Sequence, residues 1–188
     1  MEIEDRLLAL ISDLRKVLDD HVEQLKCFIR AESQFEYWFK AELFYFLEIE
    51  KGKHLIKDFE REVRLNNRQR VDFRITFGSY PNIDDAWVEL KHWLIGYQKG
   101  TKYDLDSYFT DEQSSIQDVE KLFLTPEGPK YLLVIATRNP GHDKWVEEIK
   151  RFNVRNAPFY VRAVTDPKDY PETYFIGLLR ASKKGANH

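Results

Sequence analysis

Cysteine is almost absent from this chain of 188 residues, because Cys27 is the only one. A single cysteine excludes a disulfide within the chain and a cysteine-based zinc site. Long apolar runs are also missing, since none approaches the roughly 20 residues that a membrane-spanning helix needs. The start of the chain, MEIEDRLLAL, is acidic and so differs from a signal or transit peptide. The sequence therefore predicts a cytoplasmic globular protein without a membrane partner.

A large charge of one sign is missing as well, because the formal net charge is only −3. This mild acidity argues against a protein that coats nucleic acid without specificity. Basic residues nevertheless exceed acidic ones after residue 50, so a local basic groove is compatible with the sequence. Hydrophobic residues make up 43% and aromatic residues 14% of the chain, which supports a packed core and excludes disorder.

Residues 4–30 predict one long amphipathic helix. Its apolar residues follow spacings of four and three, which is a heptad-like stripe broken only at His21. The stripe consists of Leu7, Ile11, Leu14, Leu18, Leu25 and Phe28. The helix either lies on its own domain or pairs two chains into a homodimer. We divide the chain into this N-terminal element (1–30), a main domain (31–180) and a flexible tail (181–188).

The main domain predicts an α/β fold, with a central mixed sheet flanked by helices. The expected helices cover residues 34–49, 112–124 and 143–152, and the expected strands cover 59–65, 71–77, 87–93, 131–137, 159–164 and 174–179. The first two strands alternate apolar and polar residues around a short polar turn, which predicts an antiparallel hairpin. The continuous apolar run at 131–137 predicts a strand buried on both faces. Residues 96–110 predict a loop or short helical turns.

Three polar residues stand on these apolar strands. Asp72 lies on the second strand, and Glu89 and Lys91 project from one side of the third. Carboxylates on adjacent strands can hold a hard divalent cation through oxygen. A neighbouring lysine can polarise water or stabilise charge that develops on phosphate oxygens. Hydrolysis of a phosphodiester needs this combination, although Asp72 and Lys91 could also form an ordinary cross-strand salt bridge.

Residues 33–137 resemble the PD-(D/E)xK nuclease superfamily, which has the restriction-endonuclease-like fold. The motif is carried by Val71-Asp72 and Glu89-Leu90-Lys91, on two strands that follow a helix and precede a helix and an apolar strand. Val71 departs from the proline in the family's name. The resemblance implies a metal-dependent nuclease, an endonuclease-like hydrolase that uses Mg²⁺ or Mn²⁺ and acts on DNA. The alternative is an inactive member of this fold that binds nucleic acid or assembles with a partner.

The resemblance also implies a role for each site residue. Asp72 and Glu89 would be metal ligands together with the backbone carbonyl of Leu90, and Lys91 would position or activate the attacking water. Glu36 would be the helix-borne acid of the family. Three further residues have open roles, namely Glu42, Gln117 and Lys121. Glu42 competes with Glu36, which could instead be only a capping-box acid. Gln117 and Lys121 would be auxiliary site residues or solvent-exposed positions.

Arginines gather around the predicted hairpin. They are Arg61, Arg64, Arg68, Arg70 and Arg74. Arg64, Arg68, Arg70 and Arg74 are candidate contacts to nucleic-acid phosphates beside the site. The alternative is a hairpin whose solvent-facing positions happen to be charged.

Trp87 and Trp93 flank the motif strand on the Glu89 side, where they either wall a cleft or pack under the next helix.

Overall fold

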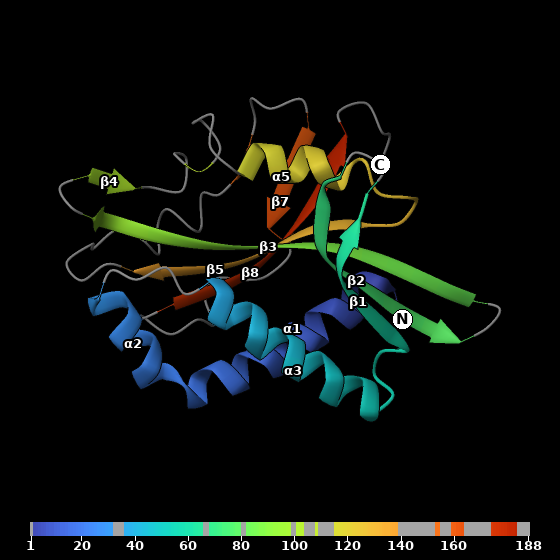
Figure 1. Ribbon diagram of the computed structural model, residues 1–188, viewed down its shortest axis with the longest axis horizontal. Coiled ribbons are helices and arrows are strands. Elements are labelled where there is room, and N and C mark those ends of the chain that lie inside the picture. The colour runs from blue at the N-terminus through green and yellow to red at the C-terminus, as the bar shows by residue number, and fades with distance from the viewer. Residues whose placement is uncertain are drawn as a thin grey trace.

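One mixed β-sheet forms the centre of the molecule, and helices cover both of its faces (Figure 1). The computed structural model describes residues 2–31, 36–65, 68–79, 82–98, 101–103, 108, 115–138, 153–154, 159–163 and 174–183. The helices are α1 (Ile3–Asp20), α2 (Val22–Arg30), α3 (Glu36–Gly52) and α5 (Ser115–Leu122). The strands are β1 (Asp58–Arg64), β2 (Arg70–Ser79), β3 (Asn82–Gln98), β4 (Thr101–Tyr103), β5 (Lys130–Arg138), β6 (Asn153–Val154), β7 (Phe159–Ala163) and β8 (Tyr174–Lys183). The α/β class expected from the sequence is confirmed.

The strands follow the order β1-β2-β3-β5-β8-β7-β6, and β4 pairs with the far end of β3. Only β3 and β5 run parallel, while the other pairs are antiparallel. The segment between β3 and β5 contains α5, as a parallel connection requires a crossover. The predicted hairpin of β1 and β2 is confirmed. Residues 131–137 of β5 are buried in the middle of the sheet, also as predicted.

The two faces of the sheet carry cores of different size. The larger core joins α1, α2 and α3 to side chains of β2, β3, β5 and β8. On the opposite face, Leu122 of α5 packs against Val63, Val71 and Trp87. Figure 1 shows α5 on one side of the sheet and α1, α2 and α3 on the other. The sheet therefore separates the side chains of α5 from those of α1, α2 and α3 wherever its strands are paired.

The long N-terminal helix expected over residues 4–30 is two helices in the structure, because the chain turns at His21. There the backbone N–H donates to the Leu18 carbonyl, and φ is −103°. A new helix then begins at Val22. The apolar stripe lies in the larger core, where Leu7, Ile11, Leu14, Leu18 and Leu25 are buried. The stripe therefore lies on its own domain, as the first interpretation predicts.

Two predicted irregular segments contain strand. Within 96–110, β3 continues to Gln98, and Tyr103 on β4 pairs with Gly96. The tail expected to begin at residue 181 is still part of β8 as far as Lys183. The predicted helix 143–152 and the capping residue Ser33 lie outside the described residues. No helix in the described ranges is long and apolar enough to cross a membrane.

Candidate active site

The sheet opens between β2 and β3 at the positions of the candidate acids. The β2–β3 pairing runs from Ser79–Asn82 to Phe73–Val88 and then stops. Beyond this point, backbone N–H groups donate to side-chain carboxylates of the neighbouring strand instead of to its backbone carbonyls. The Asp72 backbone N–H donates to Glu89 Oε2 at 3.2 Å, and the Leu90 N–H donates to Asp72 Oδ2 at 2.9 Å. Each carboxylate is thus fixed by the backbone of the neighbouring strand, and both are buried.

The strand next to this opening is locally strained. Glu62 on β1 stands opposite Asp72 in the register and has φ of 53°, in the left-handed region. A long side chain adopts this conformation at a cost of about 1–3 kcal/mol, and such residues cluster at functional sites. The Glu62 carboxylate lies 3.6 Å from the Arg70 guanidinium. The strained residue of β1 therefore lies beside Asp72 in the wall of one pocket, which supports a functional interpretation of this region.

Helix α3 reaches the opening from one face of the sheet. Its Lys40 Nζ lies 2.8 Å from Asp72 Oδ1 and 3.2 Å from Glu36 Oε1. Glu36 and Lys40 are four residues apart, so both side chains project from the same side of the helix. Burial acts to lower the pKa of Lys40, but the hydrogen bond and charge of Asp72, with Glu36, raise it well above its usual value. Lys40 is therefore a fixed cation beside Asp72.

Helix α5 reaches the opening from the other face. Its Lys121 Nζ lies 2.5 Å from Glu89 Oε1, and its Asp118 Oδ2 lies 2.7 Å from Lys91 Nζ. Lys121 also lies 3.4 Å from Asp118 Oδ1. Burial acts to lower the pKa of Lys91, but its hydrogen bond to Asp118 and the surrounding carboxylates raise it. Lys91 is therefore an ammonium ion at neutral pH.

These contacts define one charge cluster that crosses the sheet. Its members are Glu36, Lys40, Asp72, Glu89, Lys91, Asp118 and Lys121. Burial, and then the nearby charge of Asp72, raise the pKa of Glu89 to about 8, although Lys121 acts in the opposite direction. Asp72 and Glu89 each accept a hydrogen bond from the backbone of the other's strand, so the two carboxylates lie close together. Two such buried carboxylates repel each other when both are ionised. A cation at this point would relieve that repulsion.

Most of the residues predicted for the site come together in this cluster. Asp72, Glu89 and Lys91 lie at its centre, and Glu36 and Lys121 join it from the two helices. The direct Asp72–Lys91 salt bridge that was the alternative does not form, because Asp72 pairs with Lys40 and Lys91 with Asp118.

The remaining candidates lie around the cluster. Glu42 is half-buried and forms no ion pair within the described ranges, so Glu36 is the acid that α3 contributes. Gln117 is exposed on α5. Sequence reasoning missed Lys40 and Asp118. Their signals were spacings, since Lys40 is four residues after Glu36 and Asp118 is three before Lys121.

The arginines of the hairpin divide into two kinds. Arg70 lies near Glu62, and Arg74 lies 2.8 Å from Glu60 and covers the Trp87 ring. Arg64 and Arg68 are exposed, and Arg68 has φ of 70° in the turn. Both interpretations of these residues, phosphate contact and charged surface, therefore stay open.

The two tryptophans on the motif strand have different partners. Trp87 packs against Leu122, so it lies under α5 as the second interpretation proposed. Trp93 stacks on Tyr108 with ring centroids 5.2 Å apart, and the Tyr108 hydroxyl both accepts from the Leu94 N–H and donates to the Leu94 carbonyl. These contacts fix β3 on both sides of the motif.

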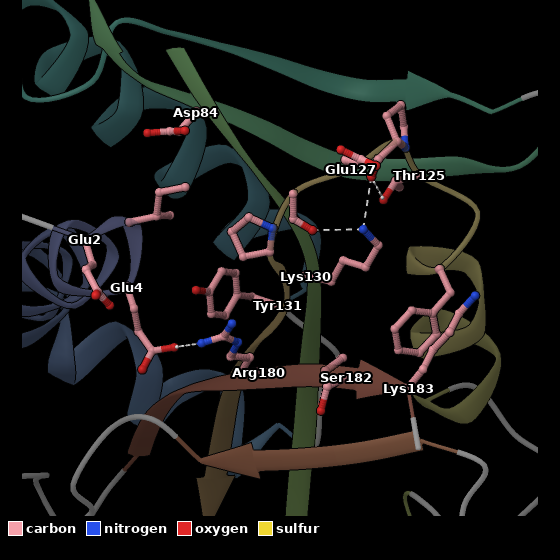
Figure 2. Close-up of a pocket in the computed structure, with 16 residues that line it drawn as sticks. Glu2, Glu4, Asp84, Thr125, Glu127, Lys130, Tyr131, Arg180, Ser182 and Lys183 are labelled. Atoms are coloured by element: carbon pink, nitrogen blue, oxygen red, sulfur yellow. Dashed lines mark hydrogen bonds and ion pairs between the residues drawn. The ribbon is translucent and has the colours of Figure 1, made fainter. Parts of the chain in front are cut away.

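Two hollows on the surface differ in their relation to the cluster. A pocket of about 240 Å³ lies between α3 and the β1–β2 hairpin, and Asp72 and Lys40 form part of its wall. A larger hollow of about 690 Å³ lies elsewhere and contains no member of the cluster (Figure 2). Its walls come from the start of α1, the 123–131 segment and the end of β8. The smaller pocket therefore reaches one of the two candidate acids, Asp72, and the larger hollow reaches neither.

The oxygen atoms of Asp72 and Glu89 are the donors that Mg²⁺ and Mn²⁺ prefer. In this structure all four are engaged, by Lys40, by Lys121 and by two backbone N–H groups. Within the described ranges, no three His, Cys, Asp or Glu side chains are placed to hold a metal together. The donor set fits a hard cation in its chemistry, provided that the lysine ammonium groups shift away.

Comparison with models of known protein families, with curated proteins and with solved structures found no match.

Proposed function

We propose that this protein is a metal-dependent nuclease with a restriction-endonuclease-like core, and that it hydrolyses phosphodiester bonds in DNA. The observation that carries the proposal is the convergence of Asp72, Glu89 and Lys91 where β2 and β3 separate. Two buried acids are held there by backbone N–H groups, and the pKa of Glu89 is raised to about 8. A buried acid with a strongly perturbed pKa, here Glu89, is a physical sign of a functional site.

Asp72 and Glu89 would hold Mg²⁺ together with the carbonyl of Leu90. When bound, the ion would supply Lewis-acid stabilisation of the phosphate oxygens and would lower the pKa of a bound water. The raised pKa of Lys91 keeps its side chain protonated, so it cannot accept a proton from water. Its ammonium group can instead donate to the phosphate oxygens as negative charge develops on them. Asp118 would be a positioning residue, because it holds Lys91 Nζ at 2.7 Å.

The reaction itself is a hydrolysis. An oxygen of water forms a bond to phosphorus, the bond from phosphorus to the leaving oxygen breaks, and the leaving oxygen takes up a proton. In this proposal the acids on the strands hold the ion, and Lys91, which Asp118 holds in place, donates to the phosphate. The open wall of the cluster is the pocket that Lys40 and Asp72 line, and a phosphodiester would approach from there.

Calorimetric titration with Mn²⁺ tests the proposal directly. We expect the wild type to bind Mn²⁺ and to cleave DNA, and we expect Asp72→Asn to lose both without unfolding. The matched control is Glu50→Gln, since Glu50 is also a buried, lysine-paired carboxylate but lies outside the cluster. Absence of Mn²⁺ binding by the wild type, with and without a DNA duplex, would contradict the proposal.

The second candidate is an inactive protein of the same fold that binds nucleic acid or assembles with a partner. The observation that favours it is that Lys40, Lys121 and backbone amides already satisfy the four acid oxygens. Such a cluster would stabilise the fold without metal. The same titration separates the two candidates, because only a nuclease site binds Mn²⁺. The predicted homodimer stays a prediction, and sedimentation of the full chain measures it.

A further inference from the structure

We infer that the pocket between α3 and β1 binds an unpaired nucleotide, so that the chain engages single-stranded DNA beside its acids. The inference deepens the proposed function and rests on it for the cleavage step. Eight residues of α3 and the hairpin line the pocket, namely Tyr37, Lys40, Ala41, Phe44, Arg61, Glu62, Asp72 and Phe73. This pocket combines an exposed aromatic ring with an acid of the cluster, which neither the large hollow nor the small apolar cavity between α1, α3 and the sheet does.

Tyr37 is the feature that first points to a base. Its side chain is 86% exposed, although it is a large aromatic residue on a well-formed helix. Ala41 follows one turn later on the same side of α3, and its small side chain leaves the space beside the ring open. An exposed aromatic face of this kind is the platform on which single-stranded nucleic acids stack their bases.

One cation of the pocket, Arg61, is placed to contact a phosphodiester strand. The Arg61 guanidinium lies 5.1 Å from the centre of the Phe44 ring, and it forms no salt bridge within the described part of the chain. The two acids at the pocket are already paired, Asp72 with Lys40 and Glu62 with Arg70. Arg61 is therefore the cation that remains to contact a phosphate or to stack on a base.

The size of the pocket favours one unpaired nucleotide over a duplex. Its volume of about 240 Å³ lies below the roughly 300–1,000 Å³ of pockets that enclose drug-sized ligands. A single planar base is a suitable occupant. In a duplex, each base is stacked between its neighbours and presents no free face to Tyr37. A base inserted here would lie in the same pocket as Lys40 and Asp72, two members of the charge cluster.

Binding without divalent metal tests this inference separately from cleavage. We would measure fluorescence anisotropy of the full chain with a labelled single-stranded oligothymidylate and with a DNA duplex, both in EDTA. We expect the single strand to bind more tightly. Tyr37→Ala should weaken its binding about 5- to 150-fold, which is the range for loss of one base–aromatic stack. Tyr37→Phe should bind as the wild type does.

Two further variants sharpen the test. Tyr45→Ala is the matched control, because Tyr45 is 65% exposed on the same helix but does not line the pocket. It should leave binding unchanged. Arg61→Gln should weaken binding and reduce the slope of log affinity against log salt by about 1.

The outcomes separate this inference from the proposed function. A wild type that binds no Mn²⁺ but binds single strands through Tyr37 would contradict the nuclease and support the pocket. Equal affinity for duplex and single strand, no binding of either, or an effect of Tyr45→Ala as large as that of Tyr37→Ala would overturn the inference. Tyr37-dependent capture of an aromatic peptide in place of the oligonucleotide would overturn it as well.

Discussion

The charge cluster and the large hollow show how little the size of a cavity says about its chemistry. The hollow is nearly three times larger than the pocket beside the cluster. Its charged groups are partly exposed and have simple partners. Arg180 lies 3.1 Å from Glu4, and Lys130 donates to the carbonyls of Pro126 and Gly128 (Figure 2). In the cluster, by contrast, acids and lysines alternate in a buried space.

Burial makes the difference between the two regions. In the hollow, burial and the nearby Lys183 lower the pKa of Lys130, and the charge of Glu127 acts in the opposite direction. In the cluster, burial is the main cause that raises the pKa of Glu89, and the adjacent Asp72 adds to it. Charges in a buried space interact more strongly than charges in an open one. Four substitutions can break or sharpen this comparison.

The largest effect is expected for the rate of DNA cleavage. Lys91→Ala should reduce it about 10²- to 10³-fold, the loss typical of one electrostatic stabiliser. Mn²⁺ affinity should be unchanged or slightly higher, because a nearby positive charge is removed. Single-turnover cleavage and calorimetry measure the two properties. Lys130→Ala in the hollow is the control and should alter neither. If Lys130→Ala loses as much of the cleavage rate as Lys91→Ala, the cluster has no special role in cleavage compared with the hollow.

The next effect concerns the dependence of stability on pH. The pKa of Glu89 is raised to about 8 in the folded chain, above its ordinary value of 4.5. The folded state therefore retains a proton that the unfolded state has lost. This contribution is complete below about pH 4.5 and disappears as the pH rises through about 8. Wild type should lose about 2–4 kcal/mol over this window relative to Glu89→Gln.

Urea unfolding in EDTA across this pH range measures the effect. Glu50→Gln is measured in parallel, because it removes a buried, lysine-paired acid outside the cluster. If the free energy of unfolding of Glu89→Gln depends on pH as that of the wild type does, Glu89 does not hold the proton that the folded state retains.

A smaller effect is expected for lysine removal. Lys121→Met leaves the buried Glu89 without its hydrogen-bonded cation, and should lower the free energy of unfolding by about 1–3 kcal/mol. Lys130→Met removes a partly exposed lysine, and should cost less than about 1 kcal/mol. Urea unfolding of both variants at neutral pH makes the comparison. If Lys130→Met loses more free energy of unfolding than Lys121→Met, the charges of the hollow interact more strongly than those of the cluster.

The smallest effect belongs to the ion pair at the rim of the hollow. Glu4→Gln removes the partner of Arg180, and should change the free energy of unfolding by about 0–1 kcal/mol, because both side chains are partly exposed. Added salt should reduce even this difference. Thermal unfolding at low and high ionic strength provides the measurement. A salt-independent loss above this range would show that the hollow is more rigid than its exposure suggests.

Sequence alone predicted the parts of the site that depend on local periodicity. Alternation along the strands placed Glu89 and Lys91 on one side of β3 and identified Asp72 on β2. It could not reveal Lys40 and Asp118 as members, because their roles depend on two helices that approach the sheet from opposite faces. Their spacings from Glu36 and Lys121 place each on a helix side with a candidate residue, but the strand residue that each contacts is a long-range property.

The fold shows the same division. Strand positions followed from alternation, and the apolar run at β5 correctly predicted burial on both faces. The break at His21 was not predicted, since neither glycine nor proline marks it. Strand β4 has only three residues, too few for a period to be recognised. Pairing with β3, rather than its own sequence, defines it.

The hydrogen bonds between the strands at the opening have a further consequence for spectroscopy. The amide protons of Asp72 and Leu90 are bonded to carboxylates instead of carbonyls. A carbonyl cannot titrate in water, but a carboxylate can gain a proton or turn toward a cation. The resonance positions and hydrogen-exchange rates of these two amides therefore report directly on the chemical state of the acids. Two backbone nuclei thus serve as built-in sensors of the site, observable without any label on the side chains.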